Sequence, residues 1–140
     1  GGYQFSLGKV YRLKEGKDVL LVSTGPQSAR CKEAAELLEG QGVSAGVLHV
    51  PTVKPVNAQE LVEACAAYPL VITVEEHNVL GGLGGLVAEI LSEHSPRKVL
   101  RFGMEDRWGE SAPNEFLLDL FELSAGRLSQ RVKKVVEAAR

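Results

Sequence analysis

Three ionisable side chains follow one another in the middle of the chain, where a short apolar run ends. They are Glu75, Glu76 and His77, and the run before them, residues 70–74, reads LVITV. A β-branched run of this length is typical of a buried strand. Polar residues just past the carboxyl end of a strand in an open α/β sheet lie where such folds usually meet ligands or partners. We therefore predict a ligand-binding or interface loop here.

A cluster of glycines extends this loop. Its members are assigned to the same predicted ligand or interface loop: Gly81, Gly82, Gly84 and Gly85. Apolar residues recur at helical spacing from Leu83 to Leu91, which predicts a helix after the turn. Helix N-termini bind anions, so the turn could hold a phosphate. As a dinucleotide-binding motif it is incomplete, because Val87 stands at the third glycine position. We favour a structural role, in which glycines let helix and sheet approach closely.

The polar cluster has sharper interpretations that the sequence supports less well. His77 could act as a general acid or bind a substrate phosphate, but a general acid needs an oriented partner, and no nucleophile lies nearby in the sequence. Glu75 and Glu76 could bind a metal ion only if the loop bends, because adjacent strand residues face opposite ways. We favour packing or interface contacts for all three residues, and we predict no catalytic residue and no metal site in this chain.

A second polar loop follows the last predicted strand. It contains Glu105 and the run Asp106, Arg107 and Trp108. Tryptophan and arginine are enriched in interface hot spots, so we favour an interface over a surface loop with a local ion pair. His49 and Lys54 lie toward the same predicted sheet edge, and for them we expect simple exposure.

Strands and helices alternate along the whole chain. The predicted strands cover residues 9–13, 19–22, 43–50, 70–74 and 99–102. The predicted helices include Cys31 to Leu38, a helix capped by Asn57, 83–91, 114–121 and a final helix capped by Ser124. This alternation predicts a parallel sheet with helices on both faces. The short turn 14–18 indicates that the first strand is antiparallel and pairs with the second. We predict one α/β domain, residues 1–140, with a five-stranded mixed sheet.

Composition limits the function classes. With 140 residues, 44% of them hydrophobic, and a net charge of −2, the chain suits a single core and gives no reason to expect nucleic acid or an anionic membrane as partner. No apolar run approaches the ~20 residues of a membrane span. Cys31 and Cys65 fall on apolar helix stripes, so we expect buried thiols in a reducing cytoplasm. A start at Gly1-Gly2 without methionine suggests a processed piece, a cloning scar or a domain excised from a longer protein.

Several short motifs together resemble the carboxyl-terminal domain of transketolase and its thiamine-diphosphate relatives, from about Tyr3 to the end. They are LGK at 7–9, EGKD at 15–18, STG at 23–25, PTVKPVN at 51–57, VEEH at 74–77 with the glycines, and DRWGES at 106–111. The Glu-Glu-His and Gly-Gly-Leu-Gly motifs are specific when they occur with the Lys-Pro loop at this distance. The resemblance is closest to split transketolases, whose smaller subunit carries this domain. Deoxyxylulose-phosphate synthase and the beta subunit of 2-oxo acid dehydrogenases are alternative parents.

The resemblance implies a three-layer α/β/α sandwich with an antiparallel first strand. It implies a cytoplasmic parent enzyme of the pentose phosphate pathway type, a dimer that transfers ketol groups between sugar phosphates with thiamine diphosphate and Mg²⁺. Those cofactors are expected in other domains, because this chain lacks a Gly-Asp-Gly motif followed by an asparagine pair. The isolated chain is expected to be inactive and to contribute dimer and interdomain surface to other transketolase domains or subunits. The alternatives are a free-standing regulatory or anion-binding module and, last, a small enzyme using His77.

Overall fold

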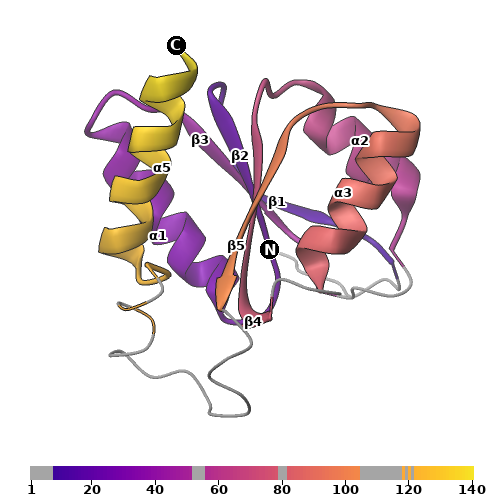
Figure 1. The fold of residues 1–140 in the computed structure, drawn as a ribbon, viewed down its shortest axis with the longest axis horizontal. Coiled ribbons are helices and arrows are strands. Elements are labelled where there is room, and N and C mark those ends of the chain that lie inside the picture. The colour runs from indigo at the N-terminus through magenta and orange to yellow at the C-terminus, as the bar shows by residue number, and fades with distance from the viewer. Residues whose placement is uncertain (1–7, 52–55, 79–81, 105–117, 119, 121) are drawn as a thin grey trace.

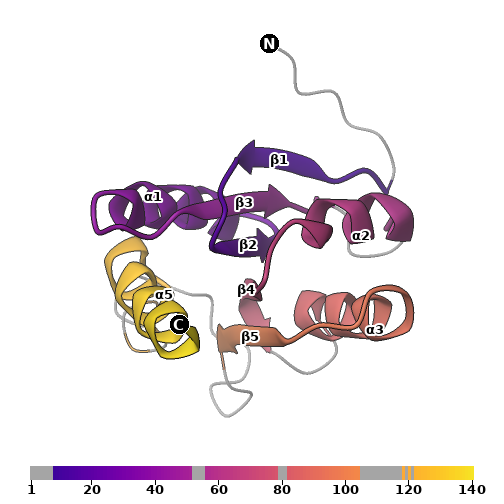
Figure 2. The same ribbon diagram turned by 90° about the horizontal axis from the view of Figure 1, so that it is seen from above.

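The computed structural model describes residues 8–51, 56–78, 82–104, 118, 120 and 122–140. Its strands are Tyr11–Lys14 (β1), Val19–Ser23 (β2), Ala45–His49 (β3), Val71–Asn78 (β4) and Val99–Met104 (β5). Its helices are Gln27–Glu39 (α1), Ala58–Ala66 (α2), Leu83–His94 (α3) and Ala125–Ala139 (α5). The strands form one sheet, with α1 and α5 on one face and α2 and α3 on the other (Figures 1 and 2). The predicted three-layer α/β/α sandwich is confirmed.

The sheet order is β1-β3-β2-β4-β5. Strands β2, β3, β4 and β5 run parallel to one another, and β1 pairs antiparallel with β3. An antiparallel first strand at the edge is therefore confirmed, but pairing of this strand with the second strand is wrong. Strands lie about 4.8 Å apart, so crossing one extra strand takes roughly 10 Å. The residues of the short connection can reach about 3.3 Å each, which is sufficient.

The connection from β1 to β2 crosses the start of β3 through a glycine. A Cβ atom on Gly16 would lie 2.3 Å from the backbone nitrogen of Gly46, so only glycine fits there. Gly46 is equally confined, because its Cβ would lie 2.2 Å from the hydroxyl oxygen of Tyr68. That hydroxyl accepts a hydrogen bond from the Gly16 backbone at 3.0 Å. Both glycines are thus required by close packing among the β1–β2 connection, β3 and Tyr68, which lies shortly after α2.

Two hydrophobic cores lie on opposite faces of the sheet. Leu21, Cys31 and Leu128 belong to the core under α1 and α5, and Leu20 and Cys65 belong to the core under α2 and α3. Every residue of β2 is buried, as its continuous apolar run predicts for a strand covered on both faces. Truncating one of these buried leucines to alanine would cost about 2–5 kcal/mol.

Helix ends follow the capping signals in part. The side chain of Asn57 accepts from the Glu60 backbone N–H at 3.0 Å, while the Asn57 N–H donates to the carbonyl of Gly8 at 2.8 Å. Ser124 takes the predicted N-cap position of the last helix. The predicted helix 114–121 lies largely outside the described residues. None of the described helices is long and apolar enough to span a bilayer.

Candidate functional site

The carboxyl edge of the parallel strands brings the first predicted polar cluster next to the start of α3. Glu75 is only 1% exposed. One of its carboxylate oxygens accepts from the backbone N–H of Leu83 at 2.9 Å, and the other accepts from Gly84 at 2.8 Å. The first N–H groups of a helix lack partners within the helix and favour negative charge. Glu75 therefore occupies the position in which a helix N-terminus would bind an external anion.

Glu76 points to the opposite face of the sheet. It forms an ion pair with Arg30 of α1, and Arg30 also donates to the side-chain oxygen of Gln27 at 3.0 Å. The buried amide of Gln27 donates to the carbonyl of Leu123 at 2.8 Å. This network joins the end of β4 to α1 and to the residues just before α5. Adjacent glutamates thus serve different helical layers, as strand alternation requires.

The end of β4 departs from regular pairing with β5. Val74 pairs with Phe102, and the next matched pair is Asn78 with Met104. Four steps along β4 therefore match two along β5, which forms a bulge over Glu75, Glu76 and His77. Bulges often re-aim side chains near functional sites. The backbone of His77 belongs to this strand, while its side chain lies outside what the structure describes.

The glycine turn packs against the sheet at one position. A Cβ on Gly84 would lie 2.8 Å from both the Thr73 hydroxyl oxygen and Cγ of Arg101. Gly82 is the N-cap of α3 in extended geometry, and nothing lies within 4 Å of a Cβ built on Gly85. Close approach of helix and sheet therefore occurs at Gly84 and not at Gly85. Gly81 lies outside the described residues.

A serine–histidine pair lies farther along the same edge. The hydroxyl oxygen of Ser28, in the first turn of α1, lies 2.6 Å from Nδ1 of His49 at the end of β3. Burial lowers the pKa of His49 below its ordinary value, which favours the neutral ring. Ser28 is buried, so its hydroxyl is poorly placed to attack a substrate. The pair joins α1 to β3.

Together these contacts make a polar rim that is satisfied from within. The carboxylates of Glu75 and Glu76 are bound to the protein's own amides and guanidinium, and the described residues contain no group of three side chains suited to a metal ion. Such a rim can hold the helices against the end of β4 and can present a surface for contacts with another domain. Within the described residues it offers no free pair of nucleophile and base.

The family model for the transketolase C-terminal domain matches residues 8–128. The chain belongs to the transketolase C-terminal domain family. A 6-deoxy-6-sulfo-D-fructose transketolase subunit from Clostridium sp. (strain MSTE9) is 38% identical over 134 residues, which are 96% of this chain and 42% of that protein. A 1-deoxy-D-xylulose-5-phosphate synthase from Halothermothrix orenii is 32% identical over 133 residues, which are 94% of this chain and 21% of that protein.

Among solved structures, a split-gene transketolase described as an inactive beta4 tetramer is similar to this transketolase C-terminal domain. The TM-score is 0.85 and the identity is 39%, over 99% of this chain and 44% of the other. The chain thus spans under half the length of these relatives, 42% of the Clostridium subunit and 44% of the split-gene chain.

Sequence reasoning located part of this transketolase C-terminal domain's polar rim and missed its partners on α1. Gln27, Ser28 and Arg30 were not singled out. A signal exists, because β4 neighbours β2 and the first turn of α1 directly follows β2. The second predicted loop, with Glu105, Asp106, Arg107 and Trp108, lies outside the described residues, as does Lys54.

Proposed function

We propose that this chain is the C-terminal, non-catalytic domain of a thiamine-diphosphate-dependent transketolase that transfers ketol groups between sugar phosphates. In this proposal the domain supplies dimer and interdomain surface. The match of the transketolase C-terminal domain model to residues 8–128 carries the assignment to a transketolase, and the pairing of Glu75 with the amides of Leu83 and Gly84 supports a non-catalytic role for the glycine turn. Because a buried carboxylate fills the anion position at α3, the glycine turn is better suited to holding the fold together than to binding a phosphate.

Thiamine diphosphate and Mg²⁺ are assigned to other parts of the parent enzyme. Magnesium is bound through carboxylate oxygens together with phosphate oxygens. At this edge Glu75 and Glu76 turn to opposite faces of the sheet, and each is bound to another group. The described residues therefore do not fit a magnesium-diphosphate site, and we derive no catalytic step through one.

The parent enzyme is proposed to be a split transketolase. The similarity to the Clostridium subunit and to the split-gene structure supports this, and both relatives are more than twice as long as the matched region. Deoxyxylulose-phosphate synthase is the alternative parent, supported by 32% identity to one such enzyme. We propose a cytoplasmic location, because Cys31 and Cys65 are buried free thiols that suit a reducing compartment. The proposed dimer rests on the family resemblance alone.

The test compares the 140-residue chain with its parent protein, supplied with its partner subunit where the parent is split. Both samples receive thiamine diphosphate, Mg²⁺, a ketose phosphate donor and an aldose phosphate acceptor. We expect ketol transfer by the parent assembly only, and no thiamine diphosphate binding to the 140-residue chain by calorimetry. Turnover or cofactor binding by the 140-residue chain would overturn the proposal.

A second measurement addresses the anion-binding alternative. Inorganic phosphate is titrated against the wild-type chain and against Glu75→Gln, with exposed Glu89→Gln on the same helix as the matched control. We expect no saturable binding to the wild type or to Glu89→Gln. Glu75→Gln removes the negative charge that excludes an anion from this position, so any gain of phosphate binding should occur in that variant alone. Saturable binding to the wild type at millimolar phosphate would favour a regulatory module.

A further inference from the structure

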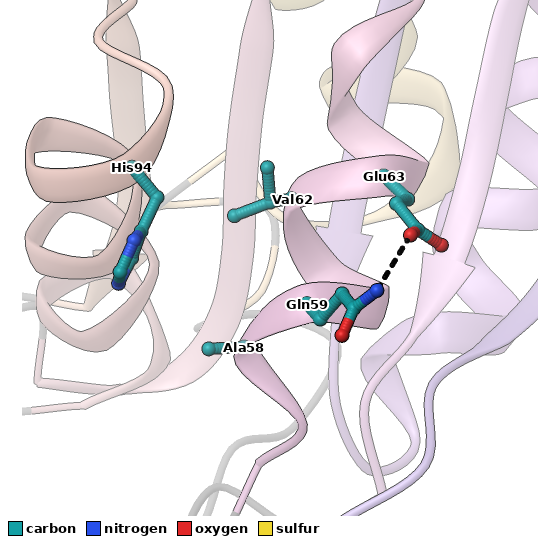
Figure 3. Close-up of a pocket in the computed structure, with 5 residues that line it drawn as sticks. All are labelled: Ala58, Gln59, Val62, Glu63 and His94. Atoms are coloured by element: carbon teal, nitrogen blue, oxygen red, sulfur yellow. Dashed lines mark hydrogen bonds between the residues drawn. The ribbon is translucent and has the colours of Figure 1, made fainter.

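A groove of about 480 Å³ lies between α2 and α3, on the face of the sheet opposite α1 and α5. Ala58, Gln59, Val62 and Glu63 line it from α2, and His94 lines it from α3. Figure 3 shows Val62 extending from α2 toward the helix that carries His94, while Gln59 and Glu63 lie together on the other side of α2. Gln59 donates to the Glu63 carboxylate at 3.1 Å. The groove therefore combines apolar surface from Ala58 and Val62 with a polar rim.

The two helices that form the groove carry charge of one sign. Their sequences contain four glutamates and neither lysine nor arginine: Glu60, Glu63, Glu89 and Glu93. In contrast, α5 on the other face carries four cations and one glutamate: Arg127, Arg131, Lys133, Lys134 and Glu137. Arg97, which follows α3, donates to the carbonyls of Cys65 and Tyr68 at the end of α2. Of these glutamates Glu63 lines the groove, and Glu93 lies beside His94, which also lines it. Complementary charge selects partners, so this groove favours an apolar side chain flanked by lysine or arginine.

The first described residue, Gly8, lies at this face of the domain. The carbonyl of Gly8 accepts from the N–H of Asn57, one residue before Ala58 at the groove. The relatives extend well beyond the matched region. The match covers 42% of the Clostridium subunit, so more than half of that protein lies outside it. In a C-terminal domain the remainder comes before, and Gly8, where the described chain begins, lies beside the first turn of α2.

We propose that the α2–α3 groove is the docking surface for a basic amphipathic helix in the part of the parent enzyme that precedes this domain. The inference rests on the proposed function, because it takes the chain to be a C-terminal domain. A nine-residue α2 is about 14 Å long, which matches two to three turns of a docked helix. Such a helix places its apolar side chains in the groove and its lysines or arginines beside Glu63 and Glu93.

Hydrogen exchange measured by mass spectrometry tests this docking surface in the parent protein and in the 140-residue chain. We expect peptides from α2 and α3 to exchange roughly tenfold more slowly in the parent, since docking suppresses local opening. Peptides from α1 should exchange alike in the two proteins. Equal exchange of α2 and α3 in both proteins, or protection of α1 instead, would overturn the proposal.

Charge reversal identifies the groove itself. In the parent, Glu63→Lys with Glu93→Lys should remove the protection of α2 and α3. Glu33→Lys with Glu36→Lys makes the same charge change on the exposed side of α1 and should leave the protection intact. Equal effects of the two double variants would contradict the docking surface.

Ketol transfer by the same parent preparation separates this inference from the proposed function. An active parent without protection of α2 and α3 overturns the docking surface alone. A parent that does not transfer ketol groups contradicts the proposed function, whatever the exchange data give.

Discussion

The N–H groups at the start of α3 face a carboxylate, and this pairing determines what the glycine turn can bind. Each oxygen of Glu75 accepts one backbone hydrogen bond, from Leu83 and from Gly84. Hydrogen bonds to charged groups contribute about 1.5–3 kcal/mol each. An external phosphate would have to displace this buried carboxylate and leave it without partners. A sequence motif that resembles an anion cradle is therefore filled by the chain's own side chain.

We expect Gly84→Ala to destabilise the domain and Gly85→Ala to stabilise it. The Cβ of Gly84→Ala would meet the buried Thr73 hydroxyl at 2.8 Å, whereas Gly85 has open space. Overpacking costs about 1–3 kcal/mol. Alanine at an unhindered helical position gains about 0.5–1 kcal/mol over glycine. Urea unfolding of both variants measures the difference, and equal midpoints for the two would contradict it.

At this scale the residue types were predictable and their partners were not. The close approach of helix and sheet was predicted for the glycines, and the structure finds it at Gly84. The partners of Glu75 and Glu76 depend on which helix covers each face of the sheet at the end of β4. Neither follows from local spacing. Both require the strand order and the layer of each helix.

Among the elements, β1 was assigned to the wrong neighbour. The predicted hairpin assumed that a short turn joins adjacent strands, but the residues after β1 cross the first residues of β3. Periodicity identifies strands and helices well, because the apolar pattern records burial. It carries little information about strand order, which depends on how a connection packs against strands distant in sequence.

We expect Gly16→Ala to weaken the pairing of β1 with β3. Its Cβ would lie 2.3 Å from the nitrogen of Gly46 and 2.4 Å from the carbonyl carbon of Ala45, and backbone atoms cannot move aside as a side chain can. We expect a loss of roughly 3 kcal/mol, as for other severe steric changes. Gly126→Ala is the control, since its Cβ meets no atom within 4 Å. Thermal unfolding and amide exchange of β3 measure both variants, and a stable Gly16→Ala variant would be evidence against the crossing.

The molecule as a whole has two cores that share one sheet, and each core contains one cysteine. Cys31 lies under α1 and Cys65 under α2, and both thiols are buried. Burial raises the pKa of Cys31 to about 12 and that of Cys65 to about 11. The reactive thiolate is therefore scarce in the folded protein at pH 8.

We expect the two thiols to become labelled at the same rate, because buried core thiols are reached by global unfolding and not by the local opening through which helix amides exchange. Because both cores pack on β2 and β4, opening either one exposes the shared strands, and small domains usually unfold as one unit. Single-cysteine variants, Cys31→Ala and Cys65→Ala, are treated with a thiol reagent at pH 8 and followed by mass spectrometry. Faster labelling of one thiol would show that its helical layer opens separately.

Because the thiol pKa values are raised, the domain should become less stable at alkaline pH. Above the ordinary thiol pKa of 9.0 the unfolded chain releases protons that the folded chain retains, so stability falls as pH rises toward about 11 and 12. Replacing both cysteines with alanine should weaken the dependence of the free energy of unfolding on pH in this range, relative to the wild type.

The crossing of β1 over β3 bears on the timing of folding during synthesis. β1 leaves the ribosome before the other described elements, yet its pairing partner, Ala45–His49, emerges some thirty residues later. Domains assemble from their amino end as the chain grows. In this domain β1 is synthesised first but has no pairing partner until β2, α1 and β3 have emerged. It is therefore added to the edge of a sheet that later residues have already begun to form.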